Sequence, residues 1–251
     1  MAARRLVDIS VALLLTCATS PLFIFAALGI WLSDPGPILY RAKRVGRGGQ
    51  PFTMHKFRSM RADPDGSGPP ITGAQDRRVF PFGAFLRSSK IDELPQLLDV
   101  MRGKMAIVGP RPEDPGIVTR HYDRRLKRTL DVLPGLTSPG ALFDYTHGSR
   151  CLTGDDIERD YVDKLLPIML EIELIYMERR SLRYDLSVVM RTAITIARVL
   201  TGQREFPDPP ELREIRRRAQ LRSNPDLQER GQQERLCGSE CTDIENSFRF
   251  D

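Results

Sequence analysis

An apolar run from Ile9 to Leu32 constrains this chain most, because none of its residues is charged. As one helix it would extend roughly 36 Å, compared with about 30 Å for the hydrocarbon core of a bilayer. Ser20 and Pro21 stand near its midpoint. Proline lacks a backbone donor and clashes with the carbonyl four residues earlier. We therefore expect the helix to kink or break at Ser20-Pro21, with the serine hydroxyl bonded to an upstream carbonyl.

Three interpretations of this run compete. A secretory signal peptide is disfavoured, because the run is long and lacks a small-x-small cleavage site. A straight transmembrane span fits the length. However, positive charge favours the cytoplasmic side of a membrane, and it flanks both ends, at Arg4, Arg5, Arg41, Lys43, Arg44 and Arg47. A hairpin that enters one leaflet and returns satisfies both ends, with arms of roughly 17 Å. From the residues alone, a dip and a kinked span stay equally open.

The charge of the chain points to an anionic partner. The formal net charge is +5, and the stretch from Arg41 to Arg61 contains many cations and no acid. Glycines before Pro51 predict a turn there with a short β-strand on either side. The cations could simply bind anionic lipid, at about 1 kcal/mol each. Nucleic acid is a weaker interpretation, because few aromatics are interleaved and no known reading module appears. The cysteines and histidines lack the spacing of metal ligands.

The fold is expected to be mainly α with short β elements. Helices are predicted over 95–101, where Pro suits the first turn, and over 121–133, 164–180 and 181–201, the last from its apolar periodicity. The last of these has one apolar face, so it is either a core helix or, as we prefer, an interfacial amphipathic helix on a membrane. We expect three regions, namely a membrane segment, a folded domain and a polar, largely disordered tail, over 1–38, 39–202 and 203–251.

Asp92 and Glu93 are the candidate chemical groups, in the segment LRSSKIDELPQLLDV. Acids at a helix start often do no more than complement the helix dipole. Here several cations are close in sequence, and opposite charge keeps a carboxylate ionised. Such a group can hold a divalent metal or attack phosphorus as a nucleophile. Adjacent helical residues point about 100° apart, so the two acids need not share one role.

Five segments together resemble one protein family. They are Ser20-Pro21, KRVGRGGQPFTMHKFRSM, LRSSKIDELPQLLDV, GKMAIVGPRP and PGLTSP. In this order they resemble the bacterial monotopic phosphoglycosyl transferases, which begin glycoconjugate assembly on polyprenyl phosphate. The resemblance covers roughly residues 1–200 and is closest to the small form of the family. A departure is Ala106, where relatives usually have serine. The segment 143–156 also departs from the nearest subgroup, which leaves the sugar undetermined.

The resemblance implies a membrane enzyme. It would move a phosphosugar from a UDP-sugar to polyprenyl (undecaprenyl) phosphate and release UMP, the first membrane step of exopolysaccharide, lipopolysaccharide or other glycoconjugate assembly. The N-terminal helix would be re-entrant and hinged at Ser20-Pro21. The catalytic domain would then contact inner-membrane lipids at the cytoplasmic face of the bacterial inner membrane.

The resemblance also assigns roles to residues. Asp92 is expected to be the nucleophile that forms a covalent aspartyl-phosphosugar, and a ligand of the cofactor Mg²⁺. Glu93 is expected to assist Asp92 in this reaction. Because a guanidinium fork suits phosphate oxygens, we expect substrate phosphates or the lipid headgroup at Lys56, Arg58, Arg87 and Arg111. The alternative is a non-enzymatic, basic, membrane-anchored module that binds anionic lipid or a protein partner. Nucleic acid is not an expected partner.

Overall fold

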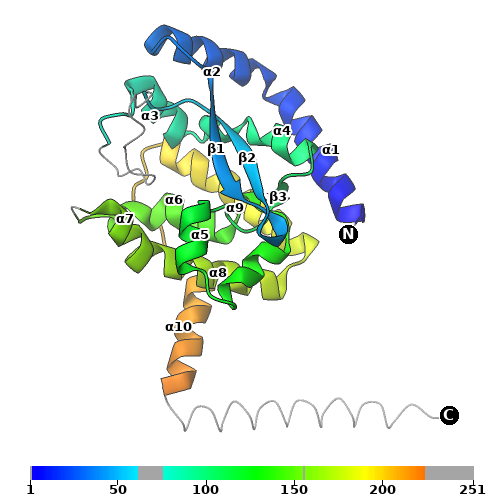
Figure 1. The fold of residues 1–251 in the computed structure, drawn as a ribbon, viewed down its shortest axis with the longest axis vertical. Helices are drawn as coiled ribbons and strands as arrows, with labels where there is room; N and C mark the ends of the chain where they lie inside the picture. The colour runs from blue at the N-terminus through cyan, green and yellow to red at the C-terminus, as the bar shows by residue number, and fades with distance from the viewer. Residues whose placement is uncertain (1, 62–75, 155, 224–251) are drawn as a thin grey trace, which may run out of the picture. The chain divides into compact units, whose positions relative to one another are not determined.

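The computed structural model describes residues 2–61, 76–154 and 156–223, and within them the chain is mainly helical with four short strands. This confirms the expected mainly α fold with short β elements (Figure 1). The chain divides into two compact units, Met1–Pro207 and Asp208–Asp251. The apolar N-terminal segment is therefore part of the larger unit. The predicted boundaries at residues 38 and 202 stay predictions.

Two helices form the apolar run, α1 (Ala2–Ala18) and α2 (Ser20–Ser33). They meet at Thr19 with a bend of 60°. Pro21 lies in the first turn of α2, where its missing donor costs least. The Ser20 hydroxyl donates to the Cys17 carbonyl at 2.9 Å, as expected for a serine that supports a bend. Among the described residues, no single helix meets the length and hydropathy needed to cross a membrane, and only this bent pair does so when its two parts are taken together.

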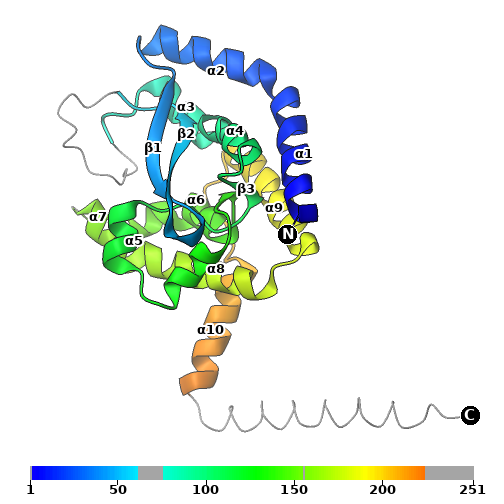
Figure 2. The same cartoon turned by 45° about the vertical axis from the view of Figure 1, so that its right-hand side comes forward.

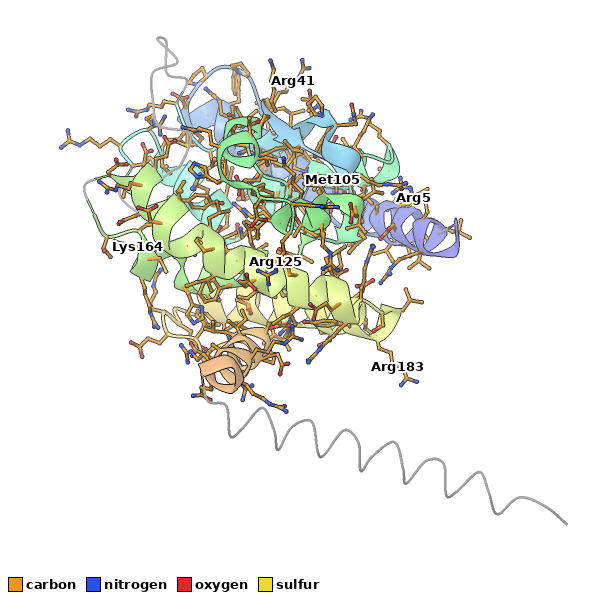
Figure 3. The ribbon with its side chains drawn as sticks, turned by 60° about the horizontal axis from the view of Figure 1, so that its bottom comes forward. Arg5, Arg41, Met105, Arg125, Lys164 and Arg183 are labelled. Carbon is orange, nitrogen blue, oxygen red and sulfur yellow. The ribbon has the colours of Figure 1, made fainter. Side chains whose placement is uncertain are left out.

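Polar side chains attach α1 to the rest of the unit. Arg5 donates to the carbonyls of Met101 at 3.2 Å and Met105 at 3.1 Å, and also to that of Val100. These carbonyls lie at or just after the C-terminal end of α4 (Gln96–Met101), where a cation complements the helix dipole. Asp8 accepts a hydrogen bond from the Ile107 amide at 3.1 Å. The two views place α1 beside α4 (Figures 1 and 2), and Arg4 forms an ion pair with Asp185 of α9 (Leu182–Leu200). Figure 3 shows where Arg5 and Met105 lie. The start of the apolar segment is thus fixed to the rest of the larger unit.

Helix α2 packs through one narrow face. Its buried residues, Ala26 and Ile30, belong to a core cluster with Phe57, Phe80 and Leu86. The rest of the helix surface leaves large apolar side chains exposed, at Leu22, Ile24, Phe25, Leu28, Trp31 and Leu32. An exposed apolar surface of this kind marks a contact with lipid or with another protein.

The strands form two small sheets. Strands β1 (Leu39–Val45) and β2 (Pro51–Phe57) confirm the expected turn between two short strands, and they pair as an antiparallel hairpin with Ala42 opposite Met54. Its turn uses left-handed backbone at Gly48 and Gly49, with φ of 68° and 77°. Strands β3 (Ala106–Val108) and β4 (Gly135–Thr137) are parallel. The main core lies between these sheets and the helices, around Met54, Leu97, Val100, Met105, Ile107 and Tyr176.

The remaining helical elements of the larger unit are α3 (Pro81–Ser88), η2 (Ile91–Glu93), α5 (Pro115–His121), η3 (Leu126–Asp131), α6 (Pro139–Cys151), α7 (Ile157–Asp160), a π-helical turn (Tyr161–Leu165), α8 (Leu166–Arg179) and α9 (Leu182–Leu200). Helices α4, α8 and α9 confirm the predictions for 95–101, 164–180 and 181–201. The helix predicted over 121–133 is confirmed only in part, because residues 126–131 form the 3₁₀ helix η3, and the Asp123 carboxylate accepts the Leu126 amide at its start at 2.7 Å.

Helix α9 is amphipathic, and its apolar stripe is exposed at Leu182, Leu186, Met190 and Ile194. Val188, on another face, is fully buried. Figure 3 shows Arg183 projecting outward near the start of the helix. The structure therefore contradicts a purely core role for α9.

The second unit contains α10 (Pro210–Ser223). Glu211 lies in its first turn, and Arg218 donates to Glu214 one turn earlier at 3.0 Å. Both features stabilise a helix, so the expectation of disorder is wrong for these residues. The rest of the predicted disordered tail, residues 224–251, lies outside the described residues.

Candidate active site

The carboxylate pair lies on η2, between α3 and α4. Asp92 is buried, and none of the described residues bonds its Oδ1 atom. Glu93 Oε1 accepts from Lys56 Nζ at 3.0 Å and from Lys90 Nζ at 3.3 Å. The pair sits in a 3₁₀ turn, and α4 begins only at Gln96. The two acids thus differ, since Glu93 is paired with cations, whereas Asp92 is buried with an oxygen that no other described residue bonds.

Burial raises the pKa of Asp92 above its ordinary value, and the charge of Glu93 raises it further, although cations oppose both effects. Burial would also raise the pKa of Glu93, but Lys56, Lys90 and Arg111 outweigh it and hold that pKa well below its ordinary value. The neighbouring cations do lower the pKa of Asp92, as expected, but burial and the charge of Glu93 outweigh them, so the pKa lies above its ordinary value. The reason is that both lysines donate to Glu93 rather than to Asp92.

Three of the four predicted phosphate-binding cations gather at this pair. Lys56 contacts Glu93 directly. The charge of Arg87 lowers the pKa of Asp92, and that of Arg111 lowers the pKa of Glu93. They come from β2, α3 and the loop after β3, so the fold brings together three separate segments. The result is an electropositive site around a buried carboxylate.

Arg58 is placed elsewhere. Its Nη1 atom donates to the Asp34 carboxylate at 2.7 Å, and its other terminal nitrogen donates to the Asp34 carbonyl. Asp34 is the residue that ends α2. Arg58 therefore ties the end of the apolar helix to the end of β2. Its predicted contact with phosphate stays a prediction, and the structure itself shows an anchoring role.

Arg111 is held by a buried polar network. Its side chain pairs with Asp144 of α6 at 3.3 Å, and its backbone amide donates to Glu173 of α8 at 3.3 Å. Ser138 donates to the same Glu173 oxygen. Glu173 thus links the VGPRP and PGLTSP segments, which the sequence places far apart. Buried networks of this kind fix the positions of their members.

Sequence reasoning missed two further residues. Tyr145 of α6 donates to the Ser88 carbonyl, and its ring lies 4.7 Å from Lys90 Nζ. Burial, with the charges of Glu93 and Asp92, raises the pKa of Tyr145 to about 12. No motif signals Tyr145, because its proximity depends on how α6 packs.

His55 was assigned no role, yet it forms a defined pair with a buried acid. Its Nδ1 lies 2.8 Å from Asp99 Oδ1, and its amide donates to Asp99 Oδ2 at 2.8 Å. Asp99 is fully buried in α4. The pair joins β2 to α4. It therefore helps to hold in place Lys56, which follows His55 in β2, and Asp92, which precedes α4 in the chain.

Known proteins are similar to this chain over most of its length. A family model described as "Bacterial sugar transferase" matches residues 1–199. The UDP-glucose:undecaprenyl-phosphate glucose-1-phosphate transferase of Caulobacter vibrioides is 37% identical over 197 residues, which are 75% of this chain and 67% of the relative. The protein of the same name from Xanthomonas campestris pv. campestris is 36% identical over 199 residues, 77% of this chain and 38% of the relative.

A third relative has a different sugar in its name. The UDP-N-acetylgalactosamine-undecaprenyl-phosphate N-acetylgalactosaminephosphotransferase of Aeromonas hydrophila is 33% identical over 202 residues, which are 79% of this chain and 44% of the relative. The chain therefore spans about two thirds of the first relative and less than half of the other two.

Proposed function

The chain belongs to the bacterial sugar transferase family, and from this premise we propose that it transfers a phosphosugar from a UDP-sugar to undecaprenyl phosphate. The observation that supports this most is a buried Asp92 whose Oδ1 has no partner among the described residues, close to Lys56, Lys90, Arg87 and Arg111. An anionic nucleophile and two anionic substrates repel one another, so their reaction needs such a cluster of cations.

The proposed reaction has two steps. In the first, an Asp92 carboxylate oxygen attacks the phosphorus that carries the sugar. A new oxygen–phosphorus bond forms, the bond from that phosphorus to the bridging oxygen breaks, and UMP leaves with the electron pair. In the second step, a phosphate oxygen of undecaprenyl phosphate attacks the same phosphorus. The Asp92–phosphorus bond then breaks, the carboxylate is restored, and undecaprenyl diphosphate sugar is the product.

The expected Mg²⁺ is consistent with the donor set at Asp92. Its Oδ1 is a carboxylate oxygen without a hydrogen-bond donor among the described residues, which suits a hard cation. The described residues contain no group of three or more His, Cys, Asp and Glu side chains placed to hold a metal. Oxygens of the UDP-sugar and water would therefore complete the coordination. When bound, the ion would neutralise charge on the diphosphate.

The same proposal places the protein on the cytoplasmic face of the bacterial inner membrane. Supporting it are the exposed apolar side chains of α1, α2 and α9 and the 60° bend at Thr19. Arg5 and Asp8 bind the folded domain, so the first turns of α1 stay on the side of the active site. A re-entrant helix pair then holds Asp92 near the phosphate of a membrane lipid, while the soluble donor arrives from the cytosol.

Cysteine labelling tests this topology. In a cysteine-free background, single cysteines at Ala3 and at the exposed Lys127 should both resist an impermeant maleimide in spheroplasts and react after lysis. A re-entrant pair keeps both positions in the cytoplasm, whereas a span separates them. Labelling of the Ala3→Cys protein alone in intact spheroplasts would show that the pair crosses the membrane.

Release of UMP tests the activity. The full chain in detergent, with undecaprenyl phosphate, Mg²⁺ and either UDP-glucose or UDP-N-acetylgalactosamine, should release UMP in equal amount to the lipid product. EDTA should stop the release. Without undecaprenyl phosphate, at most one UMP per enzyme should appear, because the covalent intermediate cannot turn over. If no UDP-sugar in a wider panel yields UMP, the alternative of a lipid- or protein-binding module is favoured.

A further inference from the structure

Lys90, two residues before Asp92, has an unusual backbone conformation. Its φ is 60° and its ψ is 12°, and within the described ranges it is the one non-glycine residue with positive φ. Glycine adopts this region without cost, whereas a lysine there is strained. Such strain persists only when the surroundings maintain it, and it is concentrated at functional sites. The contacts of the Lys90 side chain are therefore where a functional reason for this backbone strain is to be sought.

The Lys90 ammonium lies between an acid and an aromatic ring. Its Nζ is 3.3 Å from Glu93 Oε1 and 4.7 Å from the centre of the Tyr145 ring. The Tyr145 hydroxyl donates to the Ser88 carbonyl, which fixes the ring against the end of α3. A cation over an aromatic face is attracted by the negative charge of that face. Backbone and ring together direct the ammonium toward the carboxylate pair.

Glu93 cannot neutralise both of the cations that it holds. Lys56 Nζ lies 3.0 Å from the same Oε1 atom that Lys90 contacts. Even with Asp92 ionised as well, the two acids carry two negative charges against the three positive charges of Lys56, Lys90 and Arg87, so a positive charge remains for another anion. The side chain of Lys90 is 24% exposed, which leaves it within reach of a ligand from solution. A phosphate oxygen is an anion that forms strong, charge-assisted hydrogen bonds with an ammonium group.

We propose that Lys90 is a substrate-binding residue whose ammonium moves from Glu93 to a phosphate oxygen of a substrate. This inference rests on the proposed function and deepens it. The phosphate belongs either to the diphosphate of the UDP-sugar or to undecaprenyl phosphate, and the two sources share the same chemistry. The ring of Tyr145 holds the ammonium in place until the substrate arrives.

Three substitutions separate charge from backbone strain. Lys90→Met removes the charge and keeps the length, Lys90→Gly removes both the charge and the strain, and Lys90→Arg keeps a charge. The matched control is Lys127→Met, which removes an exposed charge on η3. The full chain in detergent is assayed for the KM of each substrate, for labelling by a radioactive UDP-sugar without lipid acceptor, and for binding of UDP.

We expect Lys90→Met and Lys90→Gly to raise one KM by about 10- to 100-fold, as for loss of a charged hydrogen bond. Lys90→Arg should restore most of that affinity, and Lys127→Met should resemble the wild type. The glycine variant should melt at or above the wild-type temperature, because its backbone is relieved. If Lys90 served only to form the left-handed backbone turn, glycine would form it equally well. A wild-type KM for both substrates in Lys90→Gly therefore overturns the inference.

The assays also identify the source of the phosphate. A raised KM for the UDP-sugar with slower labelling assigns Lys90 to the donor, and a raised KM for undecaprenyl phosphate with normal labelling assigns it to the lipid. Unchanged values of both in Lys90→Met overturn the inference. If the wild type releases no UMP from any donor, the proposed function fails instead. In that case the binding of UDP still tests whether Lys90 recognises phosphate. Weaker binding by Lys90→Met than by the wild type supports that recognition, and equal binding refutes it.

Discussion

Replacement of Asp92 by asparagine is expected to abolish phosphosugar transfer while the protein stays folded and bound to membranes. The amide of asparagine carries no negative charge and is a poor nucleophile, so the covalent step is lost. We expect a fall in turnover of at least about 10³-fold. Because burial raises the pKa of Asp92, its charge is costly in the folded state. The neutral variant should therefore be no less stable than the wild type.

The measurements are UMP release, covalent labelling by a radioactive UDP-sugar, and thermal unfolding of the Asp92→Asn protein. The matched control is Asp163→Asn, which makes the same change where the side chain is 61% exposed. The control should turn over at the wild-type rate. An Asp92→Asn protein with wild-type turnover would show that another group is the nucleophile.

Replacement of Gly135 by alanine is expected to destabilise the fold strongly. A Cβ atom at Gly135 would lie 2.2 Å from the Gly109 nitrogen and 2.4 Å from the Gly109 oxygen. A Cβ at Gly109 would in turn lie 2.4 Å from the Leu133 carbonyl oxygen. These contacts are with backbone on both sides, and backbone cannot rotate away as a side chain can. The pairing of β3 with β4 therefore requires glycine at both positions.

We expect Gly135→Ala to lower the free energy of unfolding by about 3–5 kcal/mol and the melting temperature by roughly 10 °C. The control is Gly116→Ala, where the nearest atom is the Asp114 carboxylate oxygen at 3.1 Å, at the end of a side chain. Thermal unfolding and far-UV circular dichroism of both variants test this. If Gly135→Ala melts within about 2 °C of the wild type, the close approach of the two strands is not required.

Local sequence was enough to predict the elements that depend on nearby residues. The break before Pro21 follows from a missing donor and a steric clash within one helical turn. The β1–β2 hairpin follows from glycines that adopt left-handed backbone at its turn. The amphipathic face of α9 follows from periodicity over its own residues. In each case the deciding interactions lie within a few positions along the chain.

The partners of charged residues could not be predicted in this way. Lys56 and Arg58 are two positions apart, yet Lys56 binds Glu93 and Arg58 binds Asp34. The conformation of Lys90 and its contact with Tyr145 also have no signal in the sequence. Opposite charges attract whatever their order in the chain, so a cluster of cations near acids does not specify which pairs form.

By itself, the sequence determined that an apolar helix bends near its middle, that a carboxylate pair follows a basic hairpin, and that both belong to the segments of a sugar transferase. Only the tertiary structure decided that both lysines pair with Glu93, while Asp92 stays buried with an oxygen that no other residue in the described ranges bonds. The physical reason is that burial and charge pairing depend on distances between segments far apart in the chain. A pKa shift, unlike a helix break, therefore appears only after the segments have packed.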